Sequence, residues 1–251
     1  MKTGKMVILA VLLLALTGTT FAGTKYVDPN ATGADDGTSW SDAFFNLQDA
    51  LAVAISGDEI RVAEGTYKPD QGGGQTPGDR NATFNLINGV EIKGGYAGYG
   101  EPNPNQRDPN NYETILSGDI GIISDNADNC YHVVTGAGND STAVIDGFTI
   151  TGGNANGSVP DDRGGGMSTY YSPSQGGSPT VANCIFQGNT AQSHGGGMYC
   201  RGSSTLTNCT FIGNSTVNFH GAGMYITGSV VNLNDCSFID NSAAWHGGGI
   251  Y

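Results

Sequence analysis

In the C-terminal third of the chain, apolar and polar positions recur in two short phrases. The first phrase places an aliphatic residue, a cysteine, a phenylalanine and an asparagine at a constant spacing, and its copies begin at Val181, Leu206 and Leu233. The second joins a histidine, three small residues, an aliphatic or thioether side chain and a tyrosine, and its copies begin 26 residues apart at His194, His220 and His246. A period in this range predicts stacked supersecondary units, each too thin to bury its apolar face alone. The chain is therefore predicted to be a solenoid.

Two solenoid types fit this period. The first phrase also matches the leucine-rich pattern, but a leucine-rich repeat returns through a helical segment with its own spaced apolar residues. Here the return segment holds glycine, β-branched and aromatic residues with no helical period. The 41 glycines and the low charged fraction of 13% suit tight corners between short strands. We therefore predict an all-β fold, a right-handed parallel β-helix.

In such a fold, equivalent residues of successive rungs lie about 4.8 Å apart and form rows. Cysteine and phenylalanine are two positions apart in the first phrase, so both are predicted to point inward. The asparagine is predicted to stand at a corner and bond the turn amides of the next rung. The three predicted rows are Cys184, Cys209 and Cys236; Phe186, Phe211 and Phe238; and Asn189, Asn214 and Asn241.

These phrases resemble the repeat of chlamydial polymorphic outer-membrane proteins, from about Ile145 to the end of the chain. The stretch Phe148 to Ile150 with Asn154 is similar to a degenerate earlier copy. Residues 26–28, 37–40 and 57–67 resemble the cap and first rungs of bacterial pectin-lyase-like β-helices. The resemblance implies a pectin-lyase-like β-helix at a cell surface or outer membrane. It implies no particular activity, because this fold hosts both enzymes and inert surface proteins.

The two ends of the chain suggest export and a longer parent protein. Lys2 and Lys5 precede an apolar run and small residues up to Ala22, which is typical of a secretory signal peptide over residues 1–22. Residues 23–251 are then one β-helix domain, with a cap and irregular rungs over 23–142 and regular repeats over 143–251. The chain stops directly after a glycine-rich phrase, where a solenoid is expected to carry a cap. We therefore expect the domain to be truncated at its C-terminus.

Upstream of the repeats, the pattern predicts one helix and several strands. Residues 39–55 read as an amphipathic capping helix, with Ser41 or Asp42 as the N-cap and Gly57 as the stop. The predicted strands cover residues 59–62, 83–86, 90–93, 114–116, 131–134 and 143–150.

The net charge limits the partners that this chain is expected to bind, and the spacing of its cysteines and histidines indicates structural roles for them. The net charge of −13 becomes −15 once the two leader lysines are removed, which argues against nucleic acid or an anionic membrane as a partner. The five cysteines contain no C-x-x-C spacing, and stacked side chains point in parallel, so we predict buried thiols. The histidine row could bridge a soft cation, but a structural ladder is the favoured interpretation.

The repeat is interrupted in one rung, where two longer excursions emerge over residues 156–163 and 168–179. Insertions in solenoids map to loops that often form the binding face. Asp161 and Asp162 could hold Ca²⁺ through carboxylate oxygens. Arg163 could pair with a uronate or accept a proton, and Tyr170 and Tyr171 could stack on sugar rings. The alternative is a solvated polar turn.

The sequence thus favours an exported, monomeric β-helix protein, secreted or at the cell surface, that acts in adhesion or carbohydrate binding. Its predicted partner is a polysaccharide, a surface glycan or a surface protein, without membrane insertion and without a required cofactor. A lyase or hydrolase acting on acidic glycans is the alternative, and a structural spacer is the third. Asp235 and Asp240 have Asn or Gly at the equivalent positions of the other repeats, so no carboxylate row favours catalysis.

Overall fold

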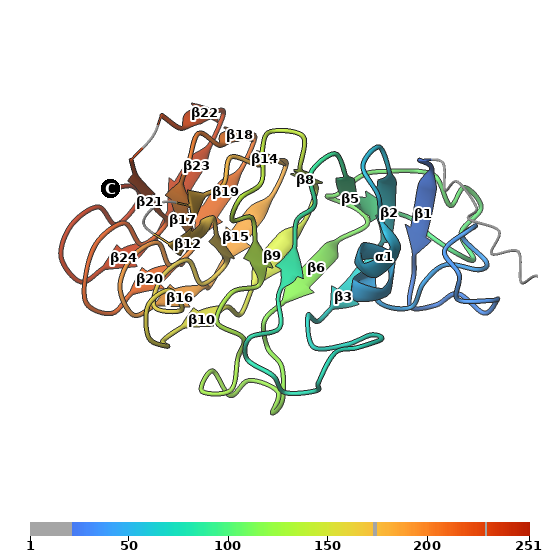
Figure 1. Cartoon of the computed structure of the whole chain (residues 1–251), viewed down its shortest axis with the longest axis horizontal. Coiled ribbons are helices and arrows are strands. Elements are labelled where there is room, and N and C mark those ends of the chain that lie inside the picture. Colours follow the sequence, from blue (N-terminus) through green and yellow to red (C-terminus); the bar gives the residue numbers. More distant parts are fainter. Residues whose placement is uncertain (1–21, 173–174, 229) are drawn as a thin grey trace, which may run out of the picture.

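The computed structural model describes residues 22–172, 175–228 and 230–251. The predicted signal peptide therefore lies almost wholly outside the described residues. Figure 1 shows short strands that follow one another along the long axis of the molecule, from the N-terminal region to the C-terminal repeats. The chain is mostly β, with four all-parallel sheets and one short helix, which is consistent with the predicted parallel β-helix.

Two sheets run along most of this length. Sheet A contains β1 (Thr24–Val27), β2 (Glu59–Ala63), β5 (Glu91–Tyr96), β8 (Val144–Asp146), β14 (Thr180–Ala182), β18 (Thr205–Thr207) and β22 (Asn232–Asn234). Sheet B contains β3 (Gly65–Tyr67), β6 (Thr114–Ser117), β9 (Thr149–Thr151), β15 (Ile185–Gln187), β19 (Thr210–Ile212) and β23 (Ser237–Ile239).

Two shorter parallel sheets complete each regular rung. Sheet C contains β4 (Phe84–Asn85), β7 (Val134–Thr135), β11 (Met167–Ser168), β17 (Met198–Arg201) and β21 (Met224–Thr227). Sheet D contains β10 (Asn154–Ala155), β16 (Thr190–Ala191), β20 (Ser215–Thr216) and β24 (Ser242–Ala243). A separate antiparallel pair joins β12 (Tyr170–Ser172) to β13 (Gln175–Gly176). A regular copy of the repeat therefore contributes one strand to each of sheets A, B, D and C in turn.

The predicted phenylalanine row is confirmed. The rings of Phe186 and Phe211 stack with centroids 4.6 Å apart, and those of Phe211 and Phe238 stack at 4.8 Å. The register pairs these residues directly across β15, β19 and β23. Since Phe186 and Phe211 are fully buried, the row forms part of the core, as inward positions of a strand require.

The predicted asparagine row is also confirmed. The Oδ1 atom of Asn214 accepts hydrogen bonds from the backbone N–H and the Nδ2 of Asn189, at 3.0 and 3.1 Å. The Nδ2 of Asn214 donates to the carbonyl of Phe186 and to Oδ1 of Asn241. Asn154, from the degenerate earlier copy, lies outside this row, because the register pairs it with Thr190. The row position is held by Gly153, whose N–H donates to Oδ1 of Asn189.

The turn between sheets A and B explains a second polar position of the repeat. Asn183, Asn208 and Asp235 have φ of 50°, 52° and 52°, in the left-handed region that Asn and Asp tolerate better than other side chains. The chain turns at this residue from β14 into β15, from β18 into β19 and from β22 into β23. Backbone geometry therefore accounts for Asn or Asp at this position, and Asp235 needs no catalytic explanation.

The N-terminal helix is shorter than predicted. Helix α1 spans Leu47–Val53, with Asn46 as its N-cap, and buries Leu47 and Leu51 against the core. The carboxylate of Asp42 accepts bonds from the Ala34 N–H and the Ser39 hydroxyl, so residues 39–46 are held in turns. Such local side-chain bonds compete with helix formation. The short helix lies near the N-terminal end of the stack (Figure 1).

The predicted strand over 143–150 is wrong in one respect, because it is two strands. Gly147, with φ of 84°, turns the chain between β8 and β9 and sends them into different sheets. A glycine inside an alternating apolar pattern marks such a bend. Across the described ranges, no helix is long and apolar enough to cross a membrane.

Candidate functional site

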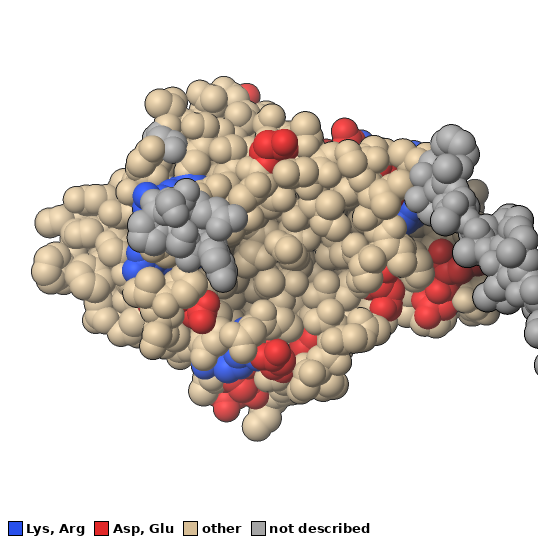
Figure 2. Space-filling model, viewed as in Figure 1, with Lys and Arg blue, Asp and Glu red and all other residues tan. Residues whose placement is uncertain are grey.

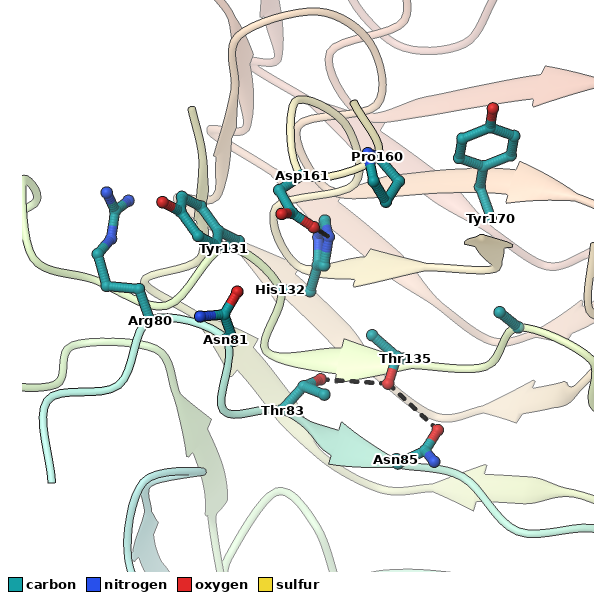
Figure 3. A pocket seen from close by; sticks show the side chains of 11 residues that line it. Arg80, Asn81, Thr83, Asn85, Tyr131, His132, Thr135, Pro160, Asp161 and Tyr170 are labelled. Carbon is teal, nitrogen blue, oxygen red and sulfur yellow. Dashed lines mark hydrogen bonds and ion pairs between the residues drawn. The ribbon is translucent and has the colours of Figure 1, made fainter. Parts of the chain in front are cut away.

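A cleft of about 420 Å³ opens on the outer side of sheet C, where β4 and β7 meet the first predicted excursion. Its floor is polar because strand alternation turns Phe84 and Val134 into the core and leaves their neighbours outside. The lining residues, shown in Figure 3, are Arg80, Asn81, Thr83, Asn85, Tyr131, His132, Thr135, Ala137, Pro160, Asp161 and Tyr170.

The floor is organised by hydroxyl and amide groups on adjacent strands. The Thr83 hydroxyl donates to that of Thr135, and the Thr135 hydroxyl donates to Oδ1 of Asn85, both at 3.3 Å. Figure 3 shows this chain of groups running across the cleft. These groups can exchange bonds with a hydroxylated ligand, because a hydroxyl both donates and accepts.

One wall of the cleft is made by a histidine and a carboxylate. The Nε2 atom of His132 lies 3.5 Å from Oδ1 of Asp161, and its Nδ1 lies 3.0 Å from the carbonyl of Gly164. The backbone N–H of Gly157 donates to the carbonyl of Asp161 and closes the excursion into a compact turn. The first predicted excursion is therefore folded against sheet C, and its carboxylate faces the cleft.

The other wall carries a cation over an aromatic ring. The guanidinium carbon of Arg80 lies 4.2 Å from the ring centroid of Tyr131, within cation–π range. Arg80 also donates from Nε to the carbonyl of Asn129 and from Nη2 to Oδ1 of Asn156, both at 2.6 Å. Arg80 thus ties the loop before β4 to the excursion and fixes the Tyr131 ring.

At the far end, a second cation–aromatic cluster holds Tyr170. The guanidinium of Arg163 lies 5.1 Å from the Tyr170 ring and 5.3 Å from the Tyr199 ring, and that of Arg201 lies 5.7 Å from the Tyr170 ring. The Nε and Nη2 atoms of Arg163 donate to the two carboxylate oxygens of Asp162, at 2.7 and 2.9 Å. Burial acts to lower the pKa of Arg163, but the bonds and charge of Asp162 outweigh it and leave that pKa above its ordinary value. Arg163 therefore stays protonated and is poorly suited to accept a proton.

The structure separates the two predicted calcium ligands. Asp161 faces His132 in the cleft, whereas Asp162 is paired with Arg163. Among the described residues, no group of three or more His, Cys, Asp or Glu side chains is placed to hold a metal ion. The calcium site at Asp161 and Asp162 stays a prediction. The predicted stacking role of Tyr171 concerns a side chain outside the described part of the structure.

Sequence reasoning missed Arg80, Tyr131 and His132, although it named Asp161 and Tyr170. The cleft combines segments that are some 50 residues apart in the chain and lie in the irregular rungs, where no period aligns them. The scarcity of basic residues could have singled out Arg80, which is one of only 10 Lys and Arg residues in the sequence.

The rings of the histidine row lie close together on successive rungs, with His194 tilted by 44° relative to His220 and with His220 stacked on His246. The ring centroids of His194 and His220 lie 5.8 Å apart, and those of His220 and His246 lie 5.2 Å apart. Burial, followed by the charge of Arg163, lowers the pKa of His194 to about 4. The neutral ring of His194 is therefore favoured at neutral pH. The Nδ1 atom of His220 is buried without a hydrogen-bond partner.

The five cysteines are free thiols. Cys130, Cys184, Cys200 and Cys209 are buried, and burial raises the pKa of Cys130 and of Cys184 to about 12. A thiol with so high a pKa is a poor nucleophile. The predicted role as buried apolar residues fits these positions.

Charged side chains are sparse on the C-terminal part of the face in Figure 2. After residue 107 the sequence contains two basic residues, Arg163 and Arg201, and both lie against the Tyr170 ring. The basic charge of this half of the molecule is therefore concentrated next to the cleft.

The comparisons with known proteins find one short similarity. The family model for the Chlamydia polymorphic membrane protein (Chlamydia_PMP) repeat matches residues 235–251, which carry Cys236, Phe238, Asn241 and the third histidine phrase. No curated protein and no solved structure matches the chain. The similarity thus covers one repeat, and it agrees with the resemblance drawn from the sequence.

Proposed function

We propose that this chain is an exported surface protein, built as a right-handed, pectin-lyase-like parallel β-helix, whose cleft on sheet C binds a saccharide. The repeat matched over residues 235–251 supports a surface or outer-membrane location. A saccharide-binding cleft on such a solenoid would serve adhesion to a glycan-bearing surface. No cofactor is required for this role.

The observation that carries the proposal is the composition of the cleft. Tyr131 and Tyr170 lie on opposite sides of it, with Asp161 and His132 between them (Figure 3). Sugars are bound by aromatic rings that pack on their apolar faces and by polar groups that fix their hydroxyls. The hydroxyl and amide groups of the floor supply the second kind of contact.

The test is binding of the chain from Gly23 onward to immobilised glycans, comparing the wild type with Tyr131→Ala and Asp161→Asn. We expect each variant to lose about five- to thirtyfold in affinity, because a stacked ring or a charge-assisted bond contributes about 1–2 kcal/mol. Tyr99→Ala is the matched control, since Tyr99 is an exposed tyrosine that does not line the cleft. Equal retention by all four proteins would refute binding in the cleft, and no retention of any of them would favour a spacer.

A lyase acting on acidic glycans is the second candidate, favoured by the presence of Arg80, His132 and Asp161 in one cleft. A cation could neutralise a uronate carboxylate while a neighbouring group accepts the proton that elimination requires. A two-carboxylate hydrolase is less well supported, because Asp161 is the single carboxylate among the residues that line the cleft. Incubation with polygalacturonate should give ultraviolet absorbance from unsaturated ends if elimination occurs. That signal, abolished by His132→Ala, would replace the binding proposal with the lyase.

A further inference from the structure

The N-terminal strand of the stack is fastened at its start by a buried carboxylate. The backbone N–H of Gly23 donates to Oδ1 of Asp58, with 2.7 Å between the nitrogen and the oxygen. The carbonyl of Gly23 in turn accepts from the N–H of Glu59, at 3.0 Å. Strand β1 begins at the next residue, Thr24, and runs parallel to β2. Both backbone polar groups of Gly23 are therefore bound to the residues at which β2 begins.

The carboxylate of Asp58 is removed from water, since its side chain has no exposed surface. Its Oδ2 atom accepts from the N–H of Ile55 at 2.7 Å and from Nζ of Lys25 at 2.8 Å. Among the described residues, Gly23 is the one partner of Oδ1. Burial acts to raise the pKa of Asp58, but the hydrogen bonds that its oxygens accept outweigh it and hold that pKa below its ordinary value. The carboxylate therefore stays ionised at neutral pH.

Gly23 is also the residue that follows the predicted leader. The signal peptide is predicted over residues 1–22, so its removal would break the peptide bond between Ala22 and Gly23, both of which are exposed. A secretory endopeptidase would catalyse this hydrolysis, with water as the only co-reactant. Ala22 gains the oxygen of the water and becomes a carboxylate, and the nitrogen of Gly23 becomes an α-ammonium group. A positive charge then arises on the atom that already lies 2.7 Å from Oδ1 of Asp58.

We propose that the chain is processed between Ala22 and Gly23, and that the new α-ammonium group of Gly23 forms an ion pair with Asp58 that fastens β1 to the stack. This inference rests on the proposed export of the chain and is independent of binding in the cleft. Cleavage at an earlier bond of the leader leaves an uncharged amide at Gly23 and no ion pair. The contact with Asp58 therefore selects one bond among those that could release the leader.

Removal of the leader strengthens a contact at the end of the stack. An amide N–H offers the carboxylate one hydrogen bond, whereas an ammonium group adds a full positive charge, which counts for more beside a carboxylate shielded from water. Strand β1 is the first strand of sheet A and has β2 as its one neighbour in that sheet (Figure 1). The end of a chain frays unless it is tied down. The precursor therefore holds its first rung less firmly than the processed protein.

The first experiment locates the cleavage. The full chain, from Met1 to Tyr251, is exported from a bacterial host, and the first residue of the product is identified by N-terminal sequencing and intact mass. We expect that residue to be Gly23. A product that retains the leader would refute both the export and this inference. Cleavage at another bond would refute this inference and leave the export in place.

The second experiment isolates the charge. Two chains that begin at Gly23 are compared, one with a free α-amino group and one with an acetyl group, which keeps the N–H and removes the charge. We expect the free form to unfold about 2–4 °C higher at about pH 7, the shift that one moderate interaction produces in a domain of this size. Pairing with Asp58 should raise the pKa of the α-amino group above its ordinary value of about 8. The gain should therefore be present below about pH 8 and be lost as the pH rises through that raised pKa.

Two variants show whether the charge acts through Asp58. Asp58→Asn should abolish the difference between the free and the acetylated form. Asp36→Asn is the matched control and should keep the difference, because Asp36 is an exposed carboxylate of the same region that bonds to Thr38. The pH dependence of the wild-type pair decides the question even if Asp58→Asn does not fold. Equal unfolding midpoints of the free and acetylated wild type from about pH 7 to about pH 10 would refute the ion pair.

Discussion

Replacing Asn214 with alanine should be among the most destabilising single changes in the regular repeats. Asn214 has no exposed surface, and its side chain makes four hydrogen bonds at once. The substitution leaves the N–H of Asn189, itself fully buried, without its acceptor. It also removes the donor to the Phe186 carbonyl and breaks the row between Asn189 and Asn241.

The magnitude follows from these bonds. A buried donor left without an acceptor costs about 1–3 kcal/mol, and each of the other lost bonds contributes about 1 kcal/mol. The expected loss is therefore about 4–6 kcal/mol, a large share of the roughly 5–15 kcal/mol by which a domain is stable. Local effects should appear first, because a repeat protein contacts mainly its neighbouring rungs.

Two measurements check this prediction. Urea unfolding followed by circular dichroism should show a lower midpoint, and hydrogen exchange should show faster exchange of the Asn189 amide. Asn218→Ala is the matched control, because Asn218 is exposed and no side-chain hydrogen bond of it is seen in the structure. A midpoint for Asn214→Ala within the range of the control, with unchanged protection of Asn189, would refute the account of the row as a main stabilising element.

Three other predictions concern protons, thiols and calcium. Because the folded pKa of His194 is lowered to about 4 by burial and then by Arg163, the unfolded chain binds its proton at a higher pH. The stability contributed by the neutral ring should be complete above about pH 6.5 and be lost as the pH falls toward 4, by about 1 kcal/mol after allowance for solvent screening. His194→Gln should flatten that slope in pH-dependent unfolding, and an unchanged slope would contradict it. Ellman's reagent should label the half-buried Cys236 quickly in the native protein and the four buried thiols only after denaturation, whereas rapid labelling of all five would contradict the buried cysteine row. If Asp161 and Asp162 bind Ca²⁺, about 1 mM CaCl₂ should raise the midpoint of thermal unfolding and Asp161→Asn should abolish the rise, while no shift in the wild type would remove calcium from the account.

The regular repeats could be predicted from the sequence because stacking makes equivalent residues neighbours. Phe186, Phe211 and Phe238 recur at one position of a phrase, and the parallel register then places their rings in contact. In the irregular rungs, no repeated spacing indicates which residues become neighbours. The helix prediction over 39–55 failed in its first half because the hydrogen bonds of Asp42 to nearby groups favour turns. The spacing of apolar residues in the sequence carries no information on such bonds.

In the sequence, the position of the cleft is indicated only by the rung in which the repeated asparagine, histidine and tyrosine are replaced by other residues. In the rung that carries the two excursions, Gly153 replaces the asparagine of its row, Arg163 the histidine, and Ser168 the tyrosine. Two of these replacements, Arg163 and Ser168, have a structural consequence next to the cleft. Arg163 holds Asp162 and the Tyr170 ring, and the small Ser168 side chain occupies the outer position that tyrosine fills in the next rung. In a solenoid the repeated residues stabilise the stack, so the residues that depart from the repeat are the ones available to form a site. The partners that face them, Tyr131 and His132, come from rungs with no repeat to depart from, and only the folded chain could identify them.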